Sequence, residues 1–288
     1  MAAFDWYQAT VRAPVDDLLE ALGSASEGFT LTHGKGHHGY SHSTVLDGSD
    51  GFRATVWHGG SHHYPHAVVT GEAAQPGAEL IRAAFPEHFV TRADAREDFG
   101  EAGAFDRILP ELLEVAKGHR VKVDTRGDHL LTMDGRTVYL GAPSSACRER
   151  LYDKAAELRA KFAADPVKLA QVPEHLARLE AQVRPQTQAA KLAFATIEPL
   201  AVMGSNAWLR EVWKRVAGLE LEPVQVGKPW RQADDERAYA YLLAQYGGLL
   251  QRVCRDLGAW DVVGLQIGHD LAEREKAEKA RIRRGLGR

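Results

Sequence analysis

A tyrosine between two cations marks the stretch of this chain that is best suited to chemistry. Arg150, Tyr152 and Lys154 fall on one side of a segment whose residues alternate at the period of a β-strand. A phenol is a poor nucleophile at its usual pKa of about 10, and nearby positive charge lowers that pKa and favours phenolate. The same cations would hold a phosphate group. A half-buried strand tyrosine with a solvated face has the same pattern, so this segment alone does not decide the role of Tyr152.

Carboxylates alternate with arginines along a second predicted strand, Phe89–Phe99. One face of this strand carries Arg92, Asp94, Arg96 and Asp98. Carboxylates two residues apart on a strand lie roughly 6.5–7 Å apart, close enough to share a divalent cation or one basic partner. An exposed edge strand with alternating charges is the alternative interpretation.

Two further segments carry polar residues at strand spacing. Leu176–Arg184 places Arg178 and Glu180 on one face, and Arg136–Gly141 contains Tyr139. The strand that carries Tyr152 is followed from Ala155 by a helix-forming run that includes Glu157. These segments therefore predict several short charged strands close together in the chain.

The elements around these segments show a recurring order. A β-rich run at Trp6–Val11 precedes an amphipathic helix at Pro14–Leu22, and Phe89–Phe99 precedes a second helix at Ala104–Lys117. The repeated strand-then-helix unit suggests an internal pseudo-repeat. Short strands joined by turns are also expected at Val121–Val123, His129–Thr132 and Arg136–Leu140. The expected fold is α+β, with antiparallel β-sheets that carry helices on one face.

The region from His33 to His66 is dense in histidine and glycine. Its histidines are His33, His37, His38, His42, His58, His62, His63 and His66. Such a cluster invites a metal-site interpretation, and a histidine-ligated metallohydrolase built on His58 to His66 is kept as a second alternative function. The interspersed glycines instead predict loops and hairpins without a rigid ligand frame, and no HExxH helix is present.

The C-terminal part of the sequence changes character after residues 184–186. Helical periodicity dominates there, and the last stretch carries a basic tail with Lys279, Arg281, Arg283 and Arg284. We expect a catalytic domain over residues 1–185 and a helical region over residues 186–288. The tail is either a nucleic-acid contact or a solvated terminus.

Composition limits the function classes. The chain has 288 residues, 44% of them hydrophobic, and a net charge of −3, which excludes wholesale charge attraction to nucleic acid but allows local basic surfaces. Cys147 and Cys254 match neither a disulfide framework nor a zinc pattern, which favours a reducing cytoplasm. No apolar run has the length of a membrane span, so no membrane partner is expected.

Four motifs in a fixed order resemble one known family. They are R-x-D-x-x-x-D at Arg92–Asp98, Y-x-G at Tyr139–Gly141, R-x-Y-x-K-x-x-E at Arg150–Glu157, and R-x-E at Arg178–Glu180. Their order and spacing resemble the replication initiation factor family, which comprises trans-acting rolling-circle Rep proteins of plasmids and filamentous phages and related relaxases. The resemblance covers about residues 89–184.

The resemblance implies an enzyme that nicks and rejoins DNA. In that family a tyrosine attacks a phosphodiester at the origin, which gives a 5′-phosphotyrosine link and a free 3′-hydroxyl, and a divalent metal assists. Carried onto this sequence, it makes Tyr152 the nucleophile, with Tyr139 as the alternative, and Arg150 and Lys154 contacts of the phosphate or phenolate. It makes Asp94 and Glu180 the leading ligands of Mg²⁺ or Mn²⁺.

The remaining sites come partly from the resemblance and partly from charge. The resemblance implies Asp98 and Glu157 as the next metal ligands. The expected DNA contacts are the arginines of the charged strands, Arg92, Arg96 and Arg178, and, from the charge of the tail alone, Lys279, Arg281, Arg283 and Arg284. The implied partners are double-stranded and single-stranded origin DNA and a host helicase, and a homodimer is compatible with the helical C-terminal region. The alternative from another class is a non-catalytic DNA-binding regulator of a phage or plasmid.

Overall fold

The computed structural model describes residues 2–227 and 234–285, with side chains described over the same ranges except at 234–238, 240 and 278–285. The chain divides into two compact units, Met1–Pro229 and Trp230–Arg288. Each unit is described by itself. Among the described residues, no helix combines the length and the apolar character that crossing a membrane requires.

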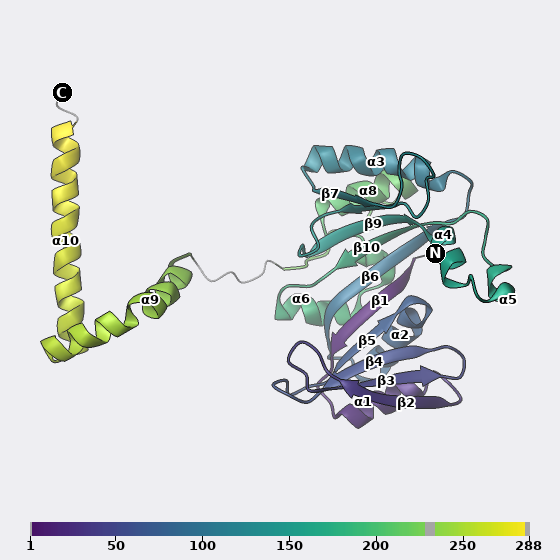
Figure 1. Cartoon of the computed structure of the whole chain (residues 1–288), viewed down its shortest axis with the longest axis horizontal. Coiled ribbons are helices and arrows are strands. Elements are labelled where there is room, and N and C mark those ends of the chain that lie inside the picture. The colour runs from purple at the N-terminus through teal and green to yellow at the C-terminus, as the bar shows by residue number, and fades with distance from the viewer. Residues whose placement is uncertain (1, 228–233, 286–288) are drawn as a thin grey trace. The chain divides into compact units, whose positions relative to one another are not determined.

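The first unit is built on one ten-stranded antiparallel sheet (Figure 1). The strands run in the order β2-β3-β4-β5-β1-β6-β10-β9-β8-β7. Their bounds are β1 Ala3–Thr10, β2 Phe29–Lys35, β3 His42–Gly48, β4 Arg53–His58, β5 His66–Thr70, β6 Phe89–Phe99, β7 Val123–Arg126, β8 Thr137–Leu140, β9 Cys147–Asp153 and β10 Ala177–Val183. The expected α+β class with antiparallel sheets is confirmed.

The sheet consists of two halves with the same topology. The first half runs β1, α1 (Val15–Gly23), then β2 to β5, and ends in α2 (Ala74–Ala84). The second half runs β6, α3 (Ala104–His119), then β7 to β10, and ends in α6 (Gln188–Ala193). The halves meet where β1 pairs antiparallel with β6. The predicted pseudo-repeat is therefore present in the topology, and it covers the histidine-rich region, which forms four paired strands.

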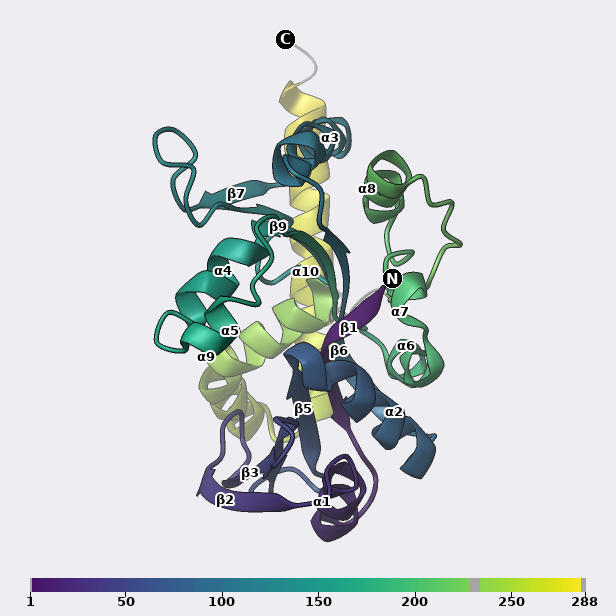
Figure 2. The same cartoon turned by 90° about the vertical axis from the view of Figure 1, so that its right-hand side faces the viewer.

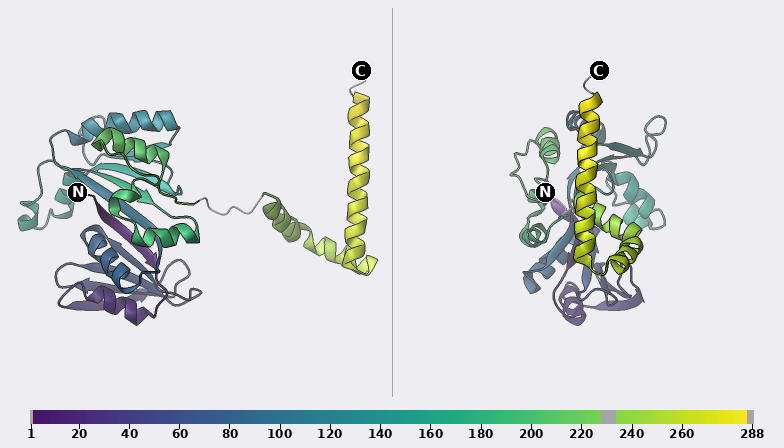
Figure 3. Two further views of the ribbon diagram at one scale, coloured as in Figure 1. Left: turned by 180° about the vertical axis from the view of Figure 1, so that it is seen from behind. Right: turned by 90° about the vertical axis from the view of Figure 1, so that its left-hand side faces the viewer.

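One face of the sheet is covered by helices. Seen edge-on, α1, α2, α6, α7 (Pro199–Val202) and α8 (Ala207–Ala217) lie on one side (Figure 2), and the view from behind shows α2, α6 and α8 in front of the strands (Figure 3). The strand residues beneath them are small and apolar. Ala93 and Ala95 of β6 are fully buried, and with no atoms beyond Cβ they allow α6 and α7 to pack closely on this strand.

The opposite face of the sheet carries the alternate, polar residues. Two short helices, α4 (Lys154–Lys161) and α5 (Pro166–Leu169), lie beside this face and leave much of it open (Figure 2). As predicted, β9 runs directly into α4, whose N-cap is Asp153, a carboxylate that accepts a hydrogen bond from the Ala156 backbone N–H at 2.8 Å. Chemistry-bearing side chains are therefore concentrated on the open face.

The first unit extends beyond the boundary expected near residues 184–186. Helices α6 and α7 contact β6, and α8 packs on α3, so these segments belong to the sheet unit. The second unit contains α9 (Asp234–Leu257) and α10 (Trp260–Gly285), which contact each other. It bears out the expected helical C-terminal region.

One predicted strand is wrong. His129–Thr132 forms a turn, in which Leu130 and Leu131 are almost fully exposed. The Asp128 carboxylate accepts hydrogen bonds from the backbone N–H groups of residues 130, 131 and 132 at 2.8–3.0 Å. This local capping competes with strand pairing, because it satisfies the backbone donors that a neighbouring strand would have used.

Candidate active site

The charged faces of three predicted strands lie side by side. Arg96 of β6 is opposite Glu180 of β10, which is opposite Arg150 of β9. One row further, Asp98 is opposite Arg178, which is opposite Tyr152. Cross-strand partners point to the same face of a sheet, so the motifs converge on a pocket of about 710 Å³ on the open face.

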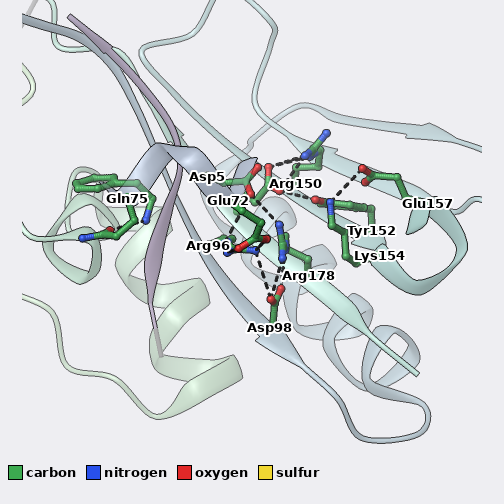
Figure 4. A network of polar contacts seen from close by, with 12 residues as sticks. Asp5, Glu72, Gln75, Arg96, Asp98, Arg150, Tyr152, Lys154, Glu157 and Arg178 are labelled. Atoms are coloured by element: carbon green, nitrogen blue, oxygen red, sulfur yellow. Dashed lines mark hydrogen bonds and ion pairs between the residues drawn. The ribbon is translucent and has the colours of Figure 1, made fainter. Parts of the chain in front are cut away.

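Tyr152 makes its closest polar contact with a carboxylate. Its hydroxyl donates a hydrogen bond to Glu180 Oε1 at 2.6 Å, and the side chain is only 4% exposed (Figure 4). Arg150 lies 4.1 Å and Lys154 5.5 Å from the ring centroid, as expected from the alternation. Burial, followed by the negative charge of Glu180, nevertheless raises the pKa of Tyr152 above its usual value. The expectation that the flanking cations lower this pKa is wrong, because both opposing effects outweigh Arg150.

Glu180 accepts hydrogen bonds from both Arg150 and Tyr152. Arg150 donates to it through Nη2 at 2.6 and 2.8 Å and through Nε at 3.1 Å. Burial raises the pKa of Glu180, although Arg150 and the Tyr152 hydroxyl favour the ionised form. A carboxylate of raised pKa in contact with a phenol is suited to accept its proton.

Two further arginines of the pocket, Arg92 and Arg96, also have carboxylate partners. Arg92 binds Asp94 through Nε at 2.9 Å, and Arg96 binds Glu72 through two nitrogens at 2.8 and 2.9 Å. Lys154 binds Glu157 at 3.0 Å on α4, at the rim of the pocket (Figure 4). Arg92 and Arg96 thus line the pocket but are neutralised within it.

Arg178 does not fit the predicted role of a DNA contact. It is 3% exposed, and its guanidinium donates to Asp98 Oδ1 at 2.5 Å and to Asp5 Oδ1 at 2.7 Å (Figure 4). Its donors are thus directed at two carboxylates of the protein. Its role in this arrangement is to position Asp5 and Asp98.

Asp5 is a site residue that the sequence reasoning missed. It lies at an irregularity in the pairing of β1 with β6, where the register shifts between Phe4 and Trp6. An aspartate is disfavoured within a strand, and its presence in the apolar run of β1 was the available signal. Glu72, which binds Arg96 from the short 3₁₀ helix η1 (Gly71–Ala73), carried no comparable signal.

The predicted metal ligands are partly brought together. All four predicted ligands line the pocket, but Glu157 lies at its rim, 48% exposed and paired with Lys154. Within the described part of the chain, no group of three or more His, Cys, Asp or Glu side chains is arranged to hold a metal ion as it stands. Burial raises the pKa of both Asp94 and Glu180, and the charge of Asp5 raises both further. A divalent cation would favour their ionised forms, and carboxylate oxygens are the ligands that such a cation prefers.

Tyr139 is the second phenol of the pocket. It lies on β8 opposite Arg150 and is more exposed than Tyr152. The guanidinium of Arg148 lies 3.8 Å from its ring centroid. Arg148 Nε and Nη2 are buried and have no hydrogen-bond partner among the described residues, unlike the guanidinium groups of the four arginines described above, which bind carboxylates. The sequence reasoning missed it, although it continues the alternation of Arg150 and Tyr152 by one step.

The hypothesis of a histidine-ligated metallohydrolase finds no support in the positions of His58 and His66. His58 bonds Thr44, whereas His66 bonds Gln8 and Thr10. Trp57 is the cross-strand partner of His66 and therefore shares its face of the sheet. His58, the next residue along the strand, lies on the opposite face. Among the described residues, these histidines form no group of three or more side chains that could hold a metal ion. The side chains of Lys279, Arg281, Arg283 and Arg284 lie outside the described residues.

Comparisons with known proteins give a likeness in fold. A solved structure of a rolling circle replication initiator protein from Geobacillus stearothermophilus aligns with a TM-score of 0.50 and 18% sequence identity, over 79% of this chain and 98% of that one. No protein-family model matches the sequence, and no curated protein does. The chain therefore has the fold of a rolling-circle replication initiator.

Proposed function

We propose that this protein is a rolling-circle replication initiator or relaxase that nicks origin DNA through Tyr152. The observation that carries the proposal is the hydrogen bond from the Tyr152 hydroxyl to Glu180, inside a pocket lined by arginines on a fold shared with such an initiator. A phenol needs a base before it attacks phosphorus, and Glu180 is in place to take the proton.

In the proposed reaction, Tyr152 Oη forms a bond to the scissile phosphorus while its proton passes to Glu180. The bond from phosphorus to O3′ breaks, O3′ takes up a proton, and the products are a 5′-phosphotyrosine and a free 3′-hydroxyl. Arg148, whose Nε and Nη2 have no hydrogen-bond partner among the described residues, is the cation that would bind the non-bridging phosphate oxygens. Arg150 holds Glu180 in contact with the phenol.

Asp5, Asp94 and Glu180 would hold a divalent metal, Mg²⁺ or Mn²⁺. When bound, such an ion stabilises the negative charge that develops on the transferred phosphate. The DNA partners in this proposal are double-stranded and single-stranded origin DNA, and the host helicase and homodimer remain part of the proposal.

The test is the covalent adduct. The protein is incubated with supercoiled origin DNA and Mn²⁺ or Mg²⁺, and a denaturing gel is examined for protein attached to a 5′ end. Tyr152→Phe removes only the nucleophilic oxygen, so it should abolish the adduct and leave origin binding nearly intact. If Tyr152→Phe still forms the adduct and Tyr139→Phe does not, Tyr139 is the nucleophile. A wild-type protein that binds the origin but never forms an adduct is a regulator without this chemistry.

A further inference from the structure

A second pocket on the open face takes no part in the proposed reaction. It has a volume of about 430 Å³ and lies on strands β1, β4 and β5 and the loops that flank them. In the pseudo-repeat, these strands correspond to β6, β9 and β10, which carry the active site. The side chains that line it are Gln8, Thr10, His38, Tyr40, Trp57, Ser61, His62, His63, Tyr64, His66 and Thr91.

The pocket is aromatic, and the described residues that line it include no acidic side chain, lysine or arginine. Arg12 approaches only its edge, 6.0 Å from the ring centroid of Tyr64. Tyr40 stacks on His62 with ring centroids 4.2 Å apart, and Trp57 lies nearly parallel to His66 at 5.7 Å. Tyr64, at the edge, is 45% exposed. Every nucleobase has a π-face that stacks on such rings, whereas a phosphate would need the cations that this pocket lacks.

His66 anchors the floor of the pocket in a fixed and neutral state. Its side chain is buried, and burial lowers its pKa to about 4. Its Nε2 lies 2.7 Å from Gln8 Nε2 and its Nδ1 lies 2.9 Å from Thr10 Oγ1, so both ring nitrogens have partners. A metal ion would find no free nitrogen on this ring.

A chain of contacts connects this pocket to the active site. Trp6 Nε1 donates to Gln8 Oε1 at 3.2 Å, which leaves the Gln8 amide N–H to donate to His66. On the other side of Trp6, the guanidinium of Arg92 lies 4.0 Å from its ring centroid and binds Asp94. Gln8 and Arg92 are also direct cross-strand partners, so both pockets open on the same face and adjoin at β1.

We propose that the pocket defined by Tyr40, Trp57, His62 and His66 binds an unstacked nucleobase of single-stranded DNA. The strand that enters the active site continues along the open face, past Trp6, and places one base against Tyr40 and Trp57. This inference rests on the proposed function, because the identity of the ligand as DNA comes from there. It adds a subsite that holds the strand through a base and not through its phosphates.

The first experiment measures binding without cleavage. Anisotropy of a fluorescein-labelled single-stranded origin oligonucleotide is titrated with full-length protein in EDTA. Tyr40→Ala should weaken binding by about 5- to 150-fold, the range that stacking of one base on one aromatic ring supports. Trp57→Phe, which keeps an aromatic ring in a half-buried position, should weaken it less. His42→Ala is the matched control and should bind like wild type, because His42 is exposed and its neighbour Ser43, not His42, is the pair of Trp57.

The second experiment removes bases in place of side chains. In a series of oligonucleotides with one abasic site each, one position should lose affinity in the wild type and lose nothing further in Tyr40→Ala. Wild-type affinity in Tyr40→Ala, or affinity that no abasic site changes, overturns the proposal even if the protein nicks DNA. A protein that shows the Tyr40-dependent abasic position but forms no covalent adduct supports this pocket and overturns the proposed chemistry.

Discussion

The Tyr152 hydroxyl and Glu180 Oε1 lie 2.6 Å apart, and the same carboxylate is bound by Arg150. The phenol is therefore coupled to a base and, through that base, to a cation. The two cations that the sequence predicted beside Tyr152, Arg150 and Lys154, lie over its ring, whereas the hydroxyl donates to Glu180.

Glu180→Gln should lower the nicking rate by about 10²- to 10⁴-fold, because it keeps the shape of the side chain and removes the base. Only ionised Glu180 accepts the proton, and burial raises its pKa, so the wild-type rate should rise with pH through that raised value. Glu180→Gln should lack this rise. Single-turnover cleavage of an oligonucleotide between pH 4.5 and 8 measures it, with exposed Glu114→Gln as control. If the wild type and Glu180→Gln had equal pH profiles, Glu180 would not be the base.

Asp94→Asn should weaken binding of Mg²⁺ or Mn²⁺. Loss of an outer-shell partner commonly costs about 10- to 100-fold in metal affinity, so loss of a direct carboxylate ligand should cost at least about 10-fold. Calorimetric titration with Mn²⁺ in the absence of DNA measures this directly. A titration curve identical to that of the wild type would place the metal elsewhere.

Arg148→Gln should weaken DNA binding through one lost phosphate contact. The log–log slope of affinity against salt concentration should fall by roughly 0.7 to 0.9, as expected for one phosphate contact. Lys117→Gln, the same charge change on exposed α3, is the control. If both variants share the same slope, Arg148 serves only to pack on Tyr139.

The strand faces were predictable because a side-chain period of two depends only on local sequence. Phe89–Phe99 has the predicted bounds as β6, and the four predicted residues Arg92, Asp94, Arg96 and Asp98 share one face. The local sequence pattern does not specify which strands are neighbours in the sheet. Arg178 meets Asp5, 173 positions away in the chain, only because β1, β6 and β10 lie side by side. The binding of Arg178 to Asp5 and Asp98, and of Glu180 to both Arg150 and Tyr152, follows from this register and was therefore missed.

Glu149 makes the stability of the folded protein depend on pH. It lies on the helix-covered face of β9, fully buried, and neither carboxylate oxygen has a hydrogen-bond partner in the part of the chain that the structure describes. Burial, followed by the charge of Glu180, raises its pKa well above the usual value, so the folded protein keeps this proton after the unfolded chain has lost it. Its contribution to stability is thus fully present below the unfolded pKa of about 4.3 and is lost as pH rises toward the folded value.

Glu149→Gln should remove that dependence. Between pH 5 and 8 the wild type should lose stability relative to the variant by up to about 1.4 kcal/mol per pH unit. Urea unfolding of both proteins at several pH values measures the difference. A constant difference across this range would mean that Glu149 is ionised in the folded state.

Deletion of the basic tail should affect DNA binding without affecting DNA cleavage. Deleting residues 271–288 removes Lys279, Arg281, Arg283 and Arg284, so if these contact phosphates, binding should weaken for all sequences and the salt slope should fall by roughly 0.7 to 0.9 per lost contact. Cleavage of a short single-stranded oligonucleotide at saturating concentration should survive, because the active site lies within the unit Met1–Pro229. Replacing only the four basic residues by glutamine is the matched control, since it keeps the length of the chain. An unchanged salt slope in both variants would assign the tail no phosphate contact and leave strand binding to the open face of the sheet.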